Sequence, residues 1–97
     1  MAAYTTLLTL QVASERLAEF EAMMQVEALL TRAFEGCDGF EIYADPARPG
    51  EVLFLEHWRS EQDSRAYGQW RTDRGDMARL GAFFTAPPTT AVLRRVA

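Results

Sequence analysis

The 97-residue sequence contains no lysine and no asparagine, and it has one cysteine and one histidine. All ten basic residues are therefore arginines. The absence of lysine excludes Schiff-base chemistry and a lysine phosphate clamp. The single Cys37 excludes an internal disulfide and a cysteine metal cluster. It lies in the turn-like stretch 35–39, where a tolerated small residue is a simpler interpretation than a nucleophile.

The sequence also lacks an excess of positive charge. Its formal net charge of -4 argues against a nucleic-acid binder, because phosphate recognition needs a concentrated basic surface. No apolar run approaches 18 residues, and no basic segment precedes an apolar run. We therefore expect a cytoplasmic protein with no nucleic-acid partner and no membrane partner.

The sequence contains enough apolar residues to form one packed core. Hydrophobic residues make up 48% of the chain and aromatic residues 11%. A chain of 97 residues leaves no room for a second domain. We expect residues 1–97 to form a single domain.

The stretch 51–61 carries the strongest signal in the chain. Its alternation predicts a strand that ends at a tryptophan, followed at once by the start of a helix. One face of the strand carries Val52, Phe54, Glu56 and Trp58, and the other carries Leu53, Leu55 and His57. Both faces are apolar at first and gain a polar group near the tip. A strand that changes in this way predicts the mouth of a pocket.

The remaining elements follow in a simple order. We expect strands over Tyr4–Val12, Phe40–Ala44, Glu51–Arg59 and Thr89–Val96, a helix over about Glu15–Phe34, and a broken helical region from Ser60 or Asp63 to about Leu80. Ser14 is a candidate N-cap, and Gly36 can end the first helix in a left-handed conformation. The loop Asp45–Gly50 predicts an antiparallel hairpin, and Ala82–Pro88 predicts an apolar loop.

The order β-α-β-β-α-β in a chain of this length is typical of an α+β, ferredoxin-like fold. The helices would cover one face of a four-stranded antiparallel sheet. The other face would carry Leu7, Leu53 and Leu55, which a monomer would leave in contact with water. We therefore expect a homodimer in which a second copy covers this face.

The chain resembles the antibiotic-biosynthesis monooxygenase family. The matching stretches are 35–43 (Glu-Gly-Cys-Asp-Gly-Phe-Glu-Ile-Tyr), the hairpin loop 45–50, and 52–58 (Val-Leu-Phe-Leu-Glu-His-Trp) followed by Ser60 and Glu61. Together with the element order and the length, the resemblance covers essentially the whole chain. It implies a dimeric α+β barrel with a small-molecule site between the sheet and the helices.

The resemblance also implies an activity. Characterised enzymes of this family oxygenate aromatic polyketides or quinols with dioxygen and without a metal, flavin or other prosthetic group. A heme-degrading branch uses a histidine nine or ten residues after the strand-end tryptophan, together with an asparagine on the first strand. Here Trp58 takes the tryptophan position, but Tyr67 and Gly68 take the histidine positions. Heme degradation by that arrangement is not expected, and we predict neither a cofactor nor a metal.

Three side chains are candidates for catalytic roles. Trp58 is the flat wall on which an aromatic ring could stack, although packing alone explains it equally well. Tyr67 could donate a hydrogen bond to a substrate oxygen, or simply cap the core with its hydroxyl in water. Glu56 lies on an otherwise apolar strand face and needs a partner if it is buried. The candidate partners are Arg65, Arg71 and Arg79. The residues expected to line a substrate-binding site are Phe54, Trp70, Ile42, Phe20 and Met24.

The mechanism that the resemblance implies is oxygenation of an electron-rich aromatic substrate after it loses a proton. The residues identify no general base. Histidine is a common general base, but His57 lies on the face opposite Trp58, so we interpret it first as an interface residue. Two alternatives stay open: a binding or accessory module of the same fold, and an isomerase or cyclase. Oxygen dependence separates the oxygenase from both.

Overall fold

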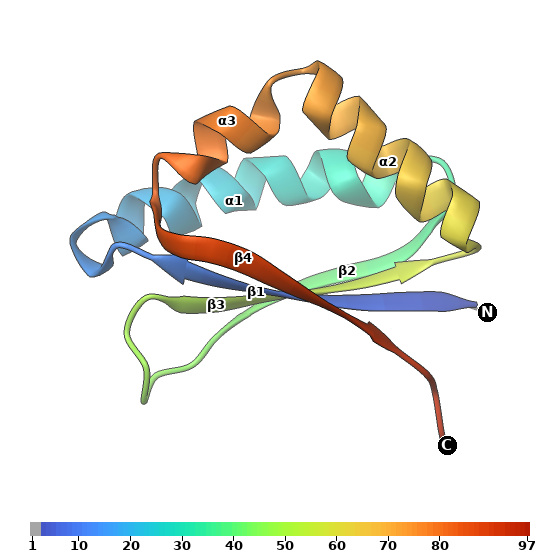
Figure 1. Cartoon of the computed structure of the whole chain (residues 1–97), viewed down its shortest axis with the longest axis horizontal. Helices are drawn as coiled ribbons and strands as arrows, with labels where there is room; N and C mark the ends of the chain where they lie inside the picture. The colour runs from blue at the N-terminus through green and yellow to red at the C-terminus, as the bar shows by residue number, and fades with distance from the viewer. Residues whose placement is uncertain (1–2) are drawn as a thin grey trace.

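A computed structural model of the chain describes residues 3–97. Within that range it contains four strands and three α-helices in the order β1 (Tyr4–Val12), α1 (Leu17–Ala33), β2 (Cys37–Ala44), β3 (Glu51–Trp58), α2 (Glu61–Asp73), α3 (Asp76–Gly81) and β4 (Phe84–Leu93). A 3-10 turn over Ser14–Arg16 precedes α1. The helices lie on one face of the sheet, and no element formed by the described residues covers the opposite face (Figure 1). The predicted α+β, ferredoxin-like fold is confirmed.

The sheet has the strand order β2-β3-β1-β4, and every neighbouring pair is antiparallel. The two apolar strands β1 and β3 are therefore central, each with a hydrogen-bonded neighbour on both sides. Their register places Thr6 opposite Glu56 and Leu8 opposite Phe54. This register brings the polar end of β3 beside a polar position of β1, on the face that the helices cover.

The core lies between that face and the long helix α1. Phe20, Met24 and Ala28 of α1 are all buried, because their spacing of four residues keeps them on one side of the helix. Phe20 stacks on Phe54 of β3, with ring centroids 6.4 Å apart. The core of buried hydrophobic residues consists of Leu10, Val12, Phe20, Met24, Ala28, Phe40, Val52, Phe54 and Phe83.

The structure confirms the predicted helix cap at Ser60 and the predicted helix break, but it does not confirm the predicted cap at Ser14. The Ser60 side chain accepts a hydrogen bond from the backbone N–H of Asp63 and so caps α2. Gly75 has a φ of 77° and separates α2 from α3, so the predicted break in this region is confirmed. Ser14 was expected to cap the first helix, but it lies within the 3-10 turn and makes no side-chain cap. That turn delays the start of α1 to Leu17.

The last strand differs most from the prediction. The stretch Ala82–Pro88 was expected to be a loop, but β4 begins at Phe84 and includes both prolines. β4 is an edge strand whose pairing with β1 is irregular between Thr9 and Val12. Proline lacks a backbone N–H and is tolerated at such an edge or irregularity. The sequence rule against proline in strands therefore fails here.

The helices α1, α2 and α3 form one layer that packs on the sheet (Figure 1). None of the helices within residues 3–97 combines the length and the apolar character needed to cross a bilayer.

The hairpin between β2 and β3 yields a test of the fold. Gly50 has a φ of 93°, and a Cβ there would collide with the backbone carbonyl oxygen of Val12. We expect Gly50→Ala to lower the free energy of unfolding by about 2–3 kcal/mol, because the residue is strained and its neighbour is backbone. Urea denaturation measures this change.

The control is Gly68→Ala in the middle of α2, where an added Cβ meets no atom within 4 Å. This substitution should raise the free energy of unfolding by about 0.5–1 kcal/mol, since alanine is the better helix former. Equal effects of the two substitutions would contradict the described hairpin geometry.

Candidate functional site

A cavity of about 350 Å³ lies between the sheet and the helices. Its apolar wall comes from β1, α1, β2, β3, α3 and β4 and includes Leu8, Leu10, Met23, Met24, Phe40, Phe54, Met77, Leu80 and Phe84. Its polar wall includes Tyr4, Thr6, Glu27, Thr31, Glu56, Ser64, Tyr67, Arg71, Asp76, Arg79 and Thr90. An apolar cavity with a few convergent polar groups is the usual form of a small-molecule site.

Glu56 is a buried carboxylate in the cavity wall. Its Oε1 accepts a hydrogen bond from Trp58 Nε1 at 3.0 Å, and Thr6 of the neighbouring strand gives a second hydrogen bond. Burial raises the pKa of Glu56, and these hydrogen bonds together with the charge of Arg71 offset the rise only in part. A carboxylate with a raised pKa is a better proton acceptor than an ordinary glutamate.

Tyr67 forms the neighbouring part of the wall and covers Trp58. The two ring centroids are 4.9 Å apart, and Phe34 packs edge-on against both rings. Burial raises the pKa of Tyr67, against the lowering effect of its hydrogen bonds with Thr31 and Arg71. The phenol therefore keeps its proton at neutral pH and is available as a donor.

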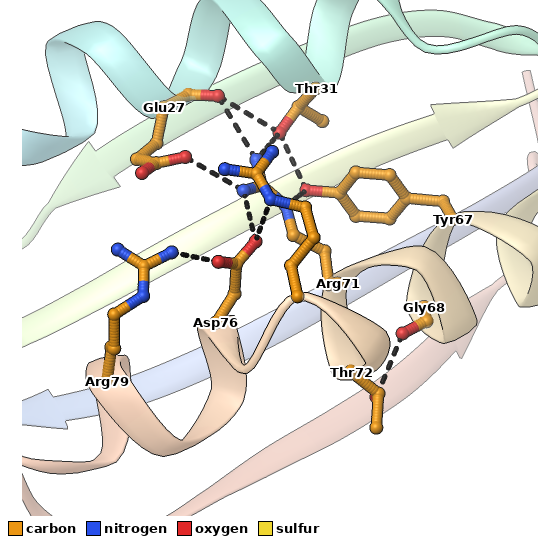
Figure 2. A network of polar contacts seen from close by, with 9 residues as sticks. Glu27, Thr31, Tyr67, Gly68, Arg71, Thr72, Asp76 and Arg79 are labelled. Atoms are coloured by element: carbon orange, nitrogen blue, oxygen red, sulfur yellow. Dashed lines mark hydrogen bonds and ion pairs between the residues drawn. The ribbon is translucent and has the colours of Figure 1, made fainter.

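Arg71 lies at the centre of a buried polar network (Figure 2). Its Nε donates to the Tyr67 hydroxyl at 2.8 Å, and its Nη1 donates to Glu27 Oε2 and Asp76 Oδ2, each at 2.8 Å. Its Nη2 donates to the Glu27 carbonyl oxygen at 3.3 Å and to Thr31 Oγ1 at 3.1 Å. Arginine has five N–H groups, so each of them has a partner.

The network fixes the charge states of its members. Burial alone would raise the pKa of Asp76, but hydrogen bonds from Arg71 and Arg79 outweigh it and hold the pKa below its usual value. Burial likewise disfavours the charged form of Arg71, but Asp76 and Glu27 raise its pKa. At neutral pH the network therefore pairs a charged Asp76 carboxylate with a charged Arg71 guanidinium.

Known proteins share this architecture. Residues 3–72 match the family model of antibiotic biosynthesis monooxygenases. The chain belongs to that family. No curated protein matches the chain in sequence.

Solved structures of similar fold lie at low identity. A conserved protein from Methanosarcina mazei Go1 has a TM-score of 0.86 and 20% identity, over 99% of this chain and 95% of its own. Rv0793 from Mycobacterium tuberculosis has a TM-score of 0.83 and 19% identity, over 97% and 95%. A structure named antibiotic biosynthesis monooxygenase has a TM-score of 0.85 and 14% identity, over 97% and 99%. At these identities the similarities establish the fold alone.

In this member of the family, four of the side chains expected at the site line the cavity: Glu56, Tyr67, Phe54 and Met24. Trp58 was expected to be a wall for the ligand, but its side chain is 0% exposed and lies behind Tyr67 and Glu56. It therefore contacts the two lining residues and makes no part of the wall.

The other expected lining residues lie elsewhere. Phe20 is fully buried in the core, and with Ile42 it borders a second, smaller pocket of about 210 Å³ between α1 and β2. Trp70 packs against Phe34, with the Arg74 guanidinium 4.6 Å from its ring centroid. Neither Ile42 nor Trp70 lines the main cavity.

The expected arginine partner of Glu56 is also corrected. Arg71 lines the same cavity, but it donates to Glu27, Asp76, Thr31 and Tyr67 instead. Within residues 3–97, no arginine forms an ion pair with Glu56. Its hydrogen bonds come from Trp58 and Thr6, because these residues flank it on the same sheet face.

Sequence reasoning did not find Thr31, Glu27 and Asp76. One signal was available for Thr31: it continues the buried stripe of Phe20, Met24 and Ala28 on α1, where a polar residue needs a partner. Asp76 immediately follows the glycine that breaks the helical region. The contact between Asp76 and Arg71 depends on how α3 packs against α2. Spacing along the chain does not determine this packing.

The network predicts a large difference between two arginines of α2. Arg71→Met should lower the free energy of unfolding by about 3–5 kcal/mol, because it leaves the buried Asp76 and Glu27 without their central partner. Arg65→Met should leave stability unchanged within experimental error, since Arg65 pairs only with Glu61 and its side chain is 78% exposed. Urea denaturation of both variants measures the contrast. A mild effect of Arg71→Met would contradict a structural role for the network.

Proposed function

We propose that the protein is a cofactor-independent monooxygenase that acts on an aromatic polyketide, quinol or similar phenolic small molecule. The observation that carries this proposal is a cavity that places a carboxylate, Glu56, and a phenol, Tyr67, beside a wall of apolar side chains. The volume is in the range of known ligand pockets. Membership of the antibiotic biosynthesis monooxygenase family supports the reaction class.

The ring of the substrate would be held by the apolar side chains of the cavity. Phe54 and Met24 lie on the sheet and on α1, and both contribute to the wall. The aromatic face of Tyr67 is fixed by its contacts with Trp58 and Phe34. Trp58 would act through these contacts and through its hydrogen bond to Glu56, as a positioning residue.

Glu56 and Tyr67 would carry out the proton transfer and stabilise the charge that it creates. Glu56 accepts a proton from the substrate, and Tyr67 donates a hydrogen bond to the substrate oxygen on which negative charge develops. The resulting carbanion or phenolate transfers an electron to dioxygen, and the two radicals combine to a peroxide at carbon. Protonation and loss of water from this peroxide leave a carbonyl group. The apolar wall excludes water from these intermediates.

A specific observation also favours a second candidate, an isomerase or cyclase. An acid and a base that line one cavity can move a proton between two positions of a substrate without oxygen. The same geometry would serve a binding module if no turnover occurred. Oxygen consumption distinguishes the first proposal from both of these.

We further propose that the protein acts as a cytoplasmic homodimer. The uncovered sheet face carries Leu7, Leu53 and Leu55, which are half-buried, and Tyr43 and Leu93, which are 51% and 41% exposed. A contiguous apolar face of this kind disfavours a monomer in water. His57 lies on this face, 3.3 Å from Thr5 Oγ1 and 3.5 Å from Glu41 Oε1, so it would lie in the interface.

The oxygenase proposal is tested by oxygen uptake of chelator-treated protein with hydroquinones and anthrone-type phenols. We expect catalysed uptake, and we expect Tyr67→Phe to lower the rate by about 10²-fold, because it removes the donor to the developing oxyanion. The matched control is Tyr43→Phe, on the uncovered sheet face, which should retain the wild-type rate.

Absence of uptake across the panel would reject the oxygenase. Conversion of a substrate at the same rate under anaerobic conditions would support the isomerase instead.

The dimer proposal is tested by sedimentation velocity. Leu55→Arg should convert a dimer into a monomer, because it places a charge at the centre of the uncovered face. Val26→Arg, at a position that is 64% exposed on α1, should leave the dimer intact. A wild-type protein that sediments as a monomer would reject the proposal.

A further inference from the structure

The polar cluster around Asp76 has more positive than negative groups. Asp76 is only 2% exposed, and it forms ion pairs with the three guanidinium groups of Arg71, Arg74 and Arg79. The one other carboxylate in these ion pairs within residues 3–97 is that of Glu27, which lies 2.8 Å from Nη1 of Arg71. Arginine stays charged in proteins. The cluster therefore contains three cations and two carboxylates, which leaves positive charge in excess.

Arg79 is the member of this cluster that can offer its charge to a ligand. Arg71 is buried and has an acceptor for every N–H group, and Arg74 stacks on Trp70 and does not line the cavity. Arg79 does line the cavity, and its side chain is 55% exposed. Within residues 3–97 its recorded hydrogen bond runs from Nη2 to Asp76 (Figure 2). The N–H groups of Nε and Nη1 are therefore open to a ligand.

The exposed residues of the cavity wall show where the cavity opens to solvent. They are Gly68, Met77, Arg79, Pro88 and Thr90. Arg79 therefore lies at the mouth, and the aromatic side chains of Phe40 and Phe54 lie in the buried part of the wall. The cavity thus combines a cationic group at its mouth with an apolar interior.

The carboxylate of Glu56 gives this cavity a polarity. It is buried in the interior part of the wall, and its hydrogen bonds come from the neutral donors Trp58 and Thr6. Like charges repel strongly where water is excluded, so an anionic group of a ligand would avoid this end. A ligand with one acidic group would therefore place that group at Arg79 and extend its apolar part toward the sheet.

We propose that the mouth of the cavity is a carboxylate-binding subsite, in which Arg79 holds the acidic head of a ligand whose apolar body fills the interior. The ligand class is an apolar monocarboxylic acid, with an aromatic or an aliphatic body. A guanidinium can donate two parallel hydrogen bonds to a carboxylate, and the open N–H groups of Arg79 can supply them. The inference concerns binding alone and does not depend on the oxygenase proposal.

Calorimetric titration with matched acids and amides tests this subsite. The probes are 2-naphthoate and octanoate, each compared with its neutral primary amide at pH 7 and low ionic strength. We expect the acid to bind about fivefold more tightly than its amide, as a partly exposed ion pair allows. Added salt should reduce this preference, because salt screens exposed charges. A preference confined to one body would support the subsite and identify the ligand as an aromatic or an aliphatic acid.

Variants of Arg79 separate a direct contact from a structural effect. Arg79→Met should remove the preference for the acid, and Arg79→Lys should retain part of it because lysine keeps the positive charge. Arg79→Met should fold, since Asp76 keeps Arg71 and Arg74 as partners. The matched control is Arg48→Met, which changes the net charge equally. Arg48 is 72% exposed and does not line the cavity, so this variant should keep the wild-type preference.

Equal binding of acid and amide in both pairs by the wild-type protein would overturn the inference, as would a preference that persists in Arg79→Met. An equal loss of affinity for acid and amide in Arg79→Met would also overturn it, because Arg79 would then act only through the shape of the cavity. Failure of all four probes to bind would reject the subsite. Selective binding of the acids without oxygen uptake on any phenol would support the inference while rejecting the oxygenase.

Discussion

The guanidinium of Arg71 is the contact on which the helical layer depends. It extends from α2, binds the side chain and backbone of α1 through Glu27 and Thr31, and binds the first residue of α3 through Asp76. Burial of a charge is unfavourable unless it is paired and hydrogen-bonded, and here every N–H of the guanidinium has an acceptor. The position of α3 over the sheet is therefore tied to a polar contact as much as to the apolar core.

This arrangement has a consequence for the cavity. Tyr67 and Arg71 of α2 and Asp76 of α3 join the polar network (Figure 2), and Trp70 of α2 packs against Phe34. An unfilled apolar space remains beside a buried carboxylate. Natural cores are normally packed to high density, so a cavity of about 350 Å³ in a chain of 97 residues is a feature that a binding function would explain.

Much of the fold could be predicted from the sequence because its signals are local. The alternation in 4–12 and 51–58, the stripe on α1, the Ser60 cap and the break at Gly75 each depend on residues close in the chain. The errors at Ser14 and at Phe84–Pro88 come from local rules that the tertiary structure overrides. An irregular edge strand accommodates the two prolines, and a 3-10 turn occupies the predicted cap.

The candidate site was less predictable, since its contacts join residues far apart in sequence. The strand face alone indicates Glu56 and Trp58 as neighbours, and the structure joins them by a hydrogen bond. The link between Arg71 and Glu27 spans 44 positions, and no pattern within either helix specifies it. The sequence identifies Arg71 as one candidate partner of Glu56. Which acceptors Arg71 binds depends on how α1 packs against α2, and the sequence pattern does not specify that packing.

The prolines of β4 also bear on how copies of the protein meet. An exposed sheet edge presents unpaired N–H and C=O groups to other chains, so strands of those chains can add to the sheet and cause aggregation. In β4 the adjacent Pro87 and Pro88 remove two backbone N–H groups from the strand that borders the sheet. Lateral growth of the sheet through that part of the edge is thereby obstructed. The two prolines are unusual in a strand, and they also oppose aggregation through this edge.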